Sequence, residues 1–316
     1  MKDLEKDIER LDLLYTLGKH SDAIDASTLI LESLLEYEGE LEGDPYRTVL
    51  LKRGASFDAL ERFNEAMEVY DFLIHADPDD VQVCRSRAHS LMMLERNEEA
   101  LDAYDRVLEL EPYPDADTFM KRGIILAGLG RHDEAVLSYD RCLELEQVQV
   151  NVWEKRGDSS ALAGRFEEAR ASYTRALDIE PLMAGIWIKL AQTLSHDEEK
   201  EMVMDAYKKA LEACDHLLRH EDDPDTWLLH AQALKGLGRN EDSIASVSKA
   251  AELYEMMGLK DAALECRRDD ERLHEPAWHR IRKGVFMEVP KAIKDMDEHE
   301  LRELAIGMMM ALKKKR

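Results

Sequence analysis

The chain has 316 residues and a formal net charge of −25. This charge argues against a general affinity of the whole protein for nucleic acid or for anionic membranes. Hydrophobic residues make up 45% of the chain, which is enough for a packed interior, and aromatic residues make up only 6%. Together with abundant Ala, Leu and Glu, this composition favours helices over sheets.

The cysteines and the chain ends indicate the compartment. The four cysteines are widely separated and form no CxxC pair, so neither a disulfide framework nor a zinc ribbon is expected. The N-terminus is charged from its second residue and lacks the apolar core of a signal peptide. The longest strongly apolar stretch, residues 304–312, is far shorter than the roughly 20 residues that span a bilayer. We expect a cytoplasmic protein without a membrane span.

Residues 1–46 are predicted to form a degenerate pair of helices. The segment "LGKHSDAIDASTLI", residues 17–30, looks like the turn and second helix of "LGRHDEAVLSYDRCL" further along the chain. An insertion around residues 38–45 separates this pair from the more regular region that follows.

Residues 47–257 repeat with a period close to 34. The triplet "KRG" occurs at residues 52–54, 121–123 and 155–157. Each copy has a small residue that is followed sixteen positions later by a tyrosine, and apolar residues recur at three- and four-residue intervals, which is typical of amphipathic helices. The small residues are Gly54, Ala88, Gly123, Gly157 and Ala191, and the tyrosines are Tyr70, Tyr104, Tyr139, Tyr173 and Tyr207.

Local chemistry predicts how each unit folds. The small residue lets two antiparallel helices approach closely, and the tyrosine fills the space beside that contact. Gly130 and Gly164 are expected to stop a helix in the left-handed conformation, and Pro78, Pro112 and Pro181 to end second helices.

This pattern resembles the tetratricopeptide repeat, a helix-turn-helix unit of 34 residues. The resemblance covers about six units in residues 47–257, with a weaker copy before them. It implies an all-α, right-handed superhelical solenoid of antiparallel helix pairs, because one unit alone cannot bury both of its helices.

Residues 258–316 leave the register and are predicted to form C-terminal capping helices with a basic tail. From residue 275 onward there are ten Lys/Arg and seven Asp/Glu, whereas the preceding residues carry 33 and 61. Besides capping the solenoid, the tail could contact an anionic membrane, an acidic partner or the solenoid itself.

Catalytic and metal sites are not indicated by the sequence. His216 and His220 share a helix face, but no third ligand is set at matching spacing, so we expect neither a metal nor a cofactor. No phosphate-loop or hydrolase motif appears, and we expect no enzyme.

The resemblance implies a groove lined by the first helices of successive units. At equivalent positions, one per unit, it would carry Lys52, Ser86, Lys121, Lys155 and Lys189. Some family members clamp the C-terminal carboxylate of a chaperone tail, and the resemblance places Arg85, His89, Lys121, Asn151 and Lys155 at the clamp positions. Both clamp asparagines are replaced, which argues against the known form of that interaction. The alternative is that these lysines are ordinary solvated helix residues.

Two functions follow as expectations. The first is a non-enzymatic scaffold that binds an extended or helical segment of a protein partner, acidic in character, in the groove. The alternative is a regulator or co-chaperone-like adaptor whose C-terminal helices respond to partner binding. Neither requires nucleic acid.

Overall fold

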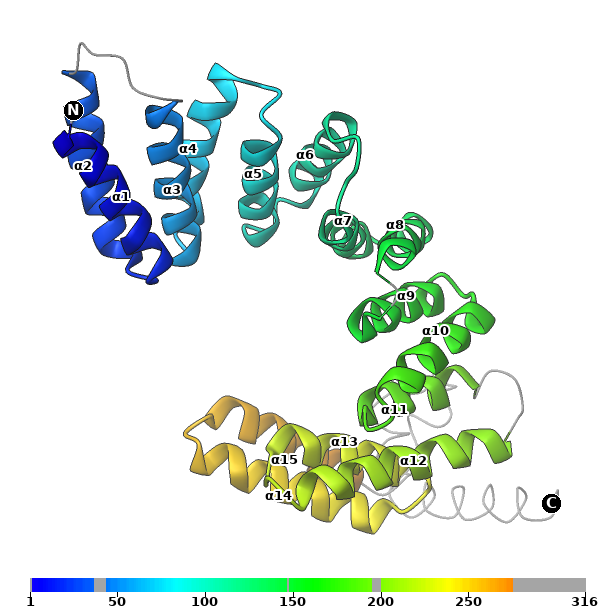
Figure 1. Ribbon diagram of the computed structural model, residues 1–316. Coiled ribbons are helices and arrows are strands. Elements are labelled where there is room, and N and C mark those ends of the chain that lie inside the picture. The colour runs from blue at the N-terminus through cyan, green and yellow to red at the C-terminus, as the bar shows by residue number, and fades with distance from the viewer. Residues whose placement is uncertain (1, 37–43, 147, 195–199, 275–316) are drawn as a thin grey trace, which may run out of the picture. The chain divides into compact units, whose positions relative to one another are not determined.

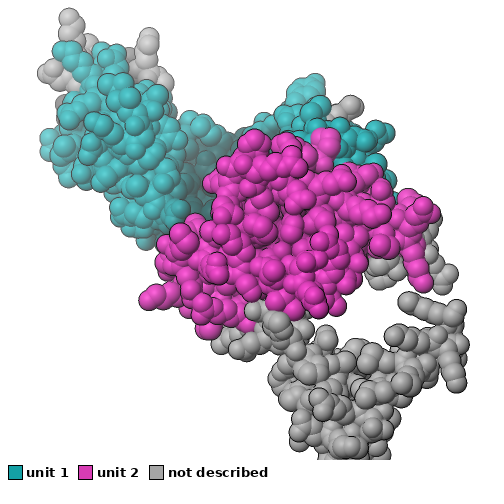
Figure 2. Space-filling model, turned by 90° about the horizontal axis from the view of Figure 1, so that it is seen from below, with its two compact units in different colours: residues 1–180 teal, residues 181–316 magenta. Residues whose placement is uncertain are grey.

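The computed structural model describes residues 2–36, 44–146, 148–194 and 200–274. These residues form fifteen helices and no strand, so the predicted all-α solenoid is confirmed (Figure 1). By contacts the chain divides into two compact units, residues 1–180 and 181–316 (Figure 2). This division does not test the predicted repeat boundaries, and the helices predicted beyond residue 275 lie outside the described residues.

Unit 1 contains five helix pairs. Its helices are α1 (Lys2–Thr16), α2 (His20–Leu35), α3 (Pro45–Ala59), α4 (Phe63–Ala76), α5 (Val81–Met93), α6 (Asn97–Leu110), α7 (Ala116–Gly128), α8 (His132–Leu145), α9 (Val150–Leu162) and α10 (Phe166–Ile179). Consecutive helices pack as pairs, and the first helices of neighbouring pairs also contact each other, α1 with α3, α3 with α5 and α7 with α9. The odd-numbered helices therefore form one layer of unit 1, called here the inner layer.

Unit 2 contains the remaining described helices, α11 (Ala184–Leu194), α12 (Lys200–Leu218), α13 (Pro224–Gly236), α14 (Asn240–Met256) and α15 (Lys260–His274). Ala263 and Cys266 of α15 pack against Val247 and Ala250 of α14 in one buried cluster. This contact gives the last repeat-like pair an apolar cover. Among the described helices, none is long and apolar enough to cross a bilayer.

The turns within pairs follow the predicted chemistry. Gly130 and Gly164 adopt φ values of 73° and 76°, as expected for a left-handed helix stop. Glu61 and Glu95 occupy the equivalent turns and adopt φ of 58°, although a side chain disfavours this region. The second helices α4, α6 and α10 end two residues before Pro78, Pro112 and Pro181, which confirms the predicted stops.

The glycine of each "KRG" triplet is explained by packing. A Cβ atom added at Gly54, Gly123 or Gly157 would lie only 2.6, 2.5 and 2.5 Å from Cε1 of the tyrosine sixteen residues later. These tyrosines are buried. The ring therefore rests directly on the helix backbone, and the third residue of the triplet has to be small.

Unit 2 modifies this contact. Tyr207 of α12 packs against Gly236 of α13, where an added Cβ would lie 2.5 Å from its Cε1. The sequence register pairs Tyr207 with Ala191 of its own unit instead. Here the glycine that receives the ring belongs to the next helix pair.

Candidate functional site

The predicted groove residues of unit 1 all lie on inner-layer helices. Lys52 is on α3, Arg85 and His89 are on α5, Lys121 is on α7, and Asn151 and Lys155 are on α9. Lys189 lies on α11 in unit 2, where it has an interaction within the chain. The predicted groove residues of unit 1 differ in how many ion pairs and hydrogen bonds they make within the protein.

Lys52 is engaged by the first helix. Its ammonium lies 2.8 Å from Oδ1 of Asp12 and 5.4 Å from the centre of the Tyr15 ring. An ion pair and a cation–π contact together fix this lysine against α1. A ligand anion at this position would compete with Asp12.

Arg85 joins α5 to the connection between α6 and α7. Its guanidinium donates to the carboxylates of Glu111 and Asp115. Glu111 is the C-terminal cap of α6, and Asp115 is the N-terminal cap of α7, where it also accepts from the backbone N–H of Thr118 at 2.8 Å. An incoming acidic group would have to displace one of these two carboxylates.

His89 on α5 lies near the positively charged Lys121 on α7. Burial, followed by the nearby positive charge of Lys121, lowers the pKa of His89 below its ordinary value. Lys121 is half-buried and pairs with Asp117 on its own helix at 2.7 Å. Since a neutral imidazole and a single ion pair leave Lys121 accessible to a second acceptor, this lysine can still receive an anion.

The Tyr104 hydroxyl lies unsatisfied beside these residues. It is buried and has no hydrogen-bond partner in the described structure. Burial raises its pKa, as does the negative charge of Asp117, while Arg85 lowers it. By contrast, the hydroxyls of Tyr70 and Tyr173 each donate to a carboxylate at 2.8 Å, on Asp58 and Asp158. A buried hydroxyl without a partner is costly, so Tyr104 carries an unsatisfied donor inside unit 1.

Lys155 and Asn151 are the least constrained of the set. Lys155 is half-buried and has no ion-pair partner within the residues described. Asn151 is exposed, and its amide contacts Sδ of Met120 on α7 at 3.8 Å. Helix α9 therefore offers a lysine ammonium and a side-chain amide that make few polar contacts within the protein.

The arginine of the triplet has a structural role that the sequence reasoning missed. Arg122 Nε lies 2.6 Å from Asp105 of the preceding pair, and Nη1 donates to Ser138 at 2.6 Å. Arg156 repeats the arrangement with Asp140 and Ser172 at 2.6 and 2.7 Å, and Arg87 pairs with Asp71 at 2.6 Å. The signal was present, because each of these aspartates directly follows a repeat tyrosine.

The predicted histidine pair is a surface feature. The rings of His216 and His220 lie 5.4 Å apart, tilted with respect to each other. Throughout the described part of the chain, no group of three His, Cys, Asp or Glu side chains is placed to hold a metal ion.

Comparisons with known proteins agree with this geometry. The family model described as "Tetratricopeptide repeat" matches residues 51–117, 85–147 and 120–184. No curated protein sequence matches the chain.

Solved structures share the fold at low sequence identity. A tetratricopeptide repeat protein from Parabacteroides merdae is 15% identical with a TM-score of 0.60, and the match covers 84% of this chain and 100% of that one. MamA is 18% identical with a TM-score of 0.53, covering 55% of this chain and 95% of that one. YrrB, described as a TPR protein with an unusual peptide-binding site, is 19% identical with a TM-score of 0.50, covering 54% of this chain and 88% of that one.

Proposed function

Residues 51–184 match the tetratricopeptide repeat family, and from that premise we propose that the protein is a non-enzymatic scaffold that binds a segment of a partner protein on the inner layer of unit 1. The observation that carries the proposal is Lys155, a half-buried lysine on an inner-layer helix with no ion-pair partner in the described residues. Of the other predicted groove lysines in unit 1, Lys52 is paired with Asp12 and Lys121 with Asp117.

The partner segment is acidic or ends in a free carboxylate. Lys121 and Lys155 would supply the positive charges, and charge-assisted hydrogen bonds to carboxylates are stronger than neutral ones. Arg85 would take part only by exchanging one of its two carboxylates for the ligand, and Asn151 can donate to the backbone of an extended segment.

Affinity purification with charge-reversed variants tests the proposal. The Lys121→Glu, Lys155→Glu double variant should lose the partners that wild type retains. The matched control is Lys208→Glu, Lys235→Glu, which makes the same charge change at exposed positions of unit 2 and should retain them. Equal recovery by wild type and the groove variant would refute the role of these lysines.

A second measurement distinguishes anchoring from steering. Once a partner is purified, its binding kinetics can be measured with each charge-reversed variant. Reversing the charge of a lysine that is buried in the complex should mainly raise the dissociation rate, whereas reversing a peripheral charge should mainly change the association rate and its salt dependence. The regulator role concerns the C-terminal helices predicted in residues 258–316, of which the structure describes only the part before residue 275, and it stays a prediction.

A further inference from the structure

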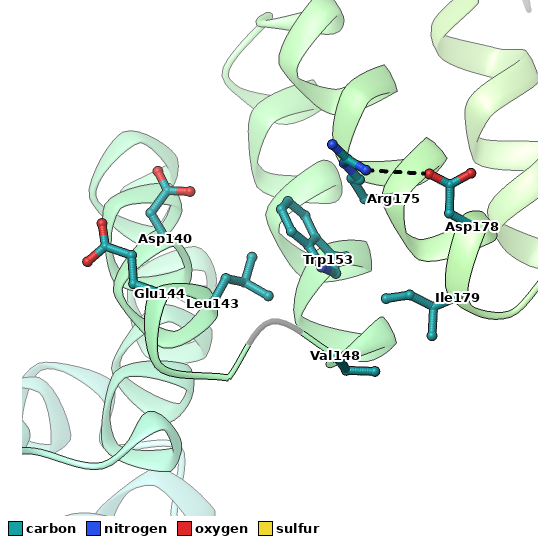
Figure 3. Close-up of a pocket in the computed structure, with 8 residues that line it drawn as sticks. All are labelled: Asp140, Leu143, Glu144, Val148, Trp153, Arg175, Asp178 and Ile179. Carbon is teal, nitrogen blue, oxygen red and sulfur yellow. Dashed lines mark ion pairs between the residues drawn. The ribbon is translucent and has the colours of Figure 1, made fainter.

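A cavity of about 630 Å³ lies on the other side of unit 1, between the second helices α8 and α10. Trp153 of α9 forms its floor, and Leu143 and Ile179 add apolar wall on the two flanks (Figure 3). Its rim carries Asp140 and Glu144 on α8. The size is within the range of natural ligand pockets, and the lining combines an aromatic face with carboxylates.

The rim carries three carboxylates, and each is paired with an arginine; Asp140 is held most firmly, by Arg156 at 2.6 Å. Asp178 and Arg175 of α10 also belong to the rim, and they pair only loosely at 3.8 Å, with both side chains more than half exposed. Glu144 pairs with Arg141 at 2.7 Å in an equally exposed contact. Exposed pairs of this kind contribute little, so a cation entering the pocket can compete for these carboxylates.

The chain contains its own example of a cation on the equivalent indole. Trp187 of unit 2 occupies the position of Trp153 in its repeat, and the ammonium of Lys209 lies 4.8 Å from the centre of its ring. Arg175 is the residue equivalent to Lys209, but it is directed to Asp178. In unit 1 the space beside the indole is thus an open cavity (Figure 3).

We propose that the cavity at Trp153 binds a lysine or arginine side chain of a partner protein. The methylene stem would lie along Leu143 and Ile179, and the cationic head would meet the face of Trp153 within reach of Glu144 and Asp178. Attraction between a cation and the indole face favours this over an apolar or an acidic side chain. The site goes beyond the proposed function, because it lies on the second helices and selects the opposite charge from the inner-layer lysines.

The test uses the indole N–H signals of the full-length protein in ¹H–¹⁵N spectra. The chain has four tryptophans, and the Trp153 signal is assigned by its loss in Trp153→Phe. The probes are N-acetyl-arginine amide and N-acetyl-lysine amide at low ionic strength, with N-acetyl-norleucine amide as an uncharged analogue of the stem. Both cations should shift the Trp153 signal saturably with dissociation constants of about 1–10 mM, and norleucine amide should bind at least about fivefold more weakly.

Variants separate the pocket from general attraction to an acidic protein. Glu144→Gln should weaken binding of the arginine probe about threefold or more, whereas Glu98→Gln, the same change on exposed α6 surface outside the cavity, should leave it unchanged. Arg175→Gln should tighten binding, because it removes a like charge from the rim. The proposal is overturned by a Trp153 signal that does not respond to either cation, by an equal response to norleucine amide, or by equal effects of Glu144→Gln and Glu98→Gln.

Discussion

Replacing Gly123 by alanine tests the contact that defines the repeat. The new Cβ would lie 2.5, 2.8 and 2.9 Å from Cε1, Cδ1 and Cζ of Tyr139, whereas carbon atoms in good contact are about 3.5–4.0 Å apart. The ring, which is 1% exposed, must therefore move by about 1 Å within a close-packed core. Overpacking of this kind costs about 1–3 kcal/mol, and alanine recovers about 1 kcal/mol through its higher helix propensity.

The net expectation is a loss of about 1 kcal/mol in the free energy of unfolding. The middle of the overpacking range is used and not its upper end, because Ala88 and Tyr104 occupy the equivalent positions of another unit, so the fold can accept a shifted ring. The matched control is Gly128→Ala at the end of the same helix. There the nearest atom, Nδ2 of Asn97, is 3.8 Å from the added Cβ, and a gain of up to about 1 kcal/mol is expected.

Urea unfolding followed by circular dichroism measures both variants. Their midpoints should differ in opposite directions from wild type, equivalent to about 2 kcal/mol between them. Tyr139→Phe should not rescue Gly123→Ala, because the clash is with ring carbons and not with the hydroxyl. The reasoning fails if Gly123→Ala is as stable as Gly128→Ala.

Two further predictions concern a turn and a histidine. Glu95→Gly should raise the free energy of unfolding by up to about 1 kcal/mol, since glycine adopts φ of 58° without steric cost. Gly130→Glu should lower the free energy of unfolding for the converse reason. Urea unfolding of both variants checks that the two changes have opposite signs. His230, which lies 3.3 Å from Asp215 and 2.8 Å from Ser246, has a pKa held below its ordinary 6.5, mainly by burial. Its neutral form is therefore favoured in the folded state, and stability should fall as the pH drops below about 6.5 because the unfolded chain takes up the proton first. Thermal unfolding is measured at pH 7.5 and at pH 5. The drop in melting temperature between the two pH values should be smaller for His230→Gln than for wild type, and the exposed His216→Gln control should show the same drop as wild type. An equal drop in all three proteins would contradict this.

The sequence was sufficient for features that depend on backbone geometry within one unit. Gly130 had to be a turn residue and Gly123 a packing residue, because no other side chain fits those positions without cost. Both expectations are confirmed by backbone angles and by the Tyr139 contact. The family pattern worked because such constraints repeat in every unit.

The sequence did not predict the contacts that side chains make with neighbouring helix pairs. Arg85 was expected in a ligand site, but it holds the caps Glu111 and Asp115, which lie 26 and 30 residues away. Tyr207 packs against Gly236 of the following pair, a contact that the register within its own unit does not contain. These contacts depend on how neighbouring helix pairs are aligned with each other, and the repeat pattern of one unit does not contain that alignment. The site residues on the inner layer stay predictions until a partner is found.

The arginine contacts of unit 1 give its stack of helix pairs a direction. Each middle pair donates an arginine to the pair before it and offers an aspartate to the pair after it, as Arg122 does with Asp105. At the first step Arg53 reaches a neutral group instead, Oγ1 of Thr28 at 2.8 Å, and on α10 the position of the aspartate is held by Thr174. Middle pairs are thus alike in these charged contacts, whereas the two terminal pairs carry neutral ends. A middle pair could be duplicated or removed by a single in-frame genetic event without stranding a charge, which offers a physical route by which such a protein changes its length.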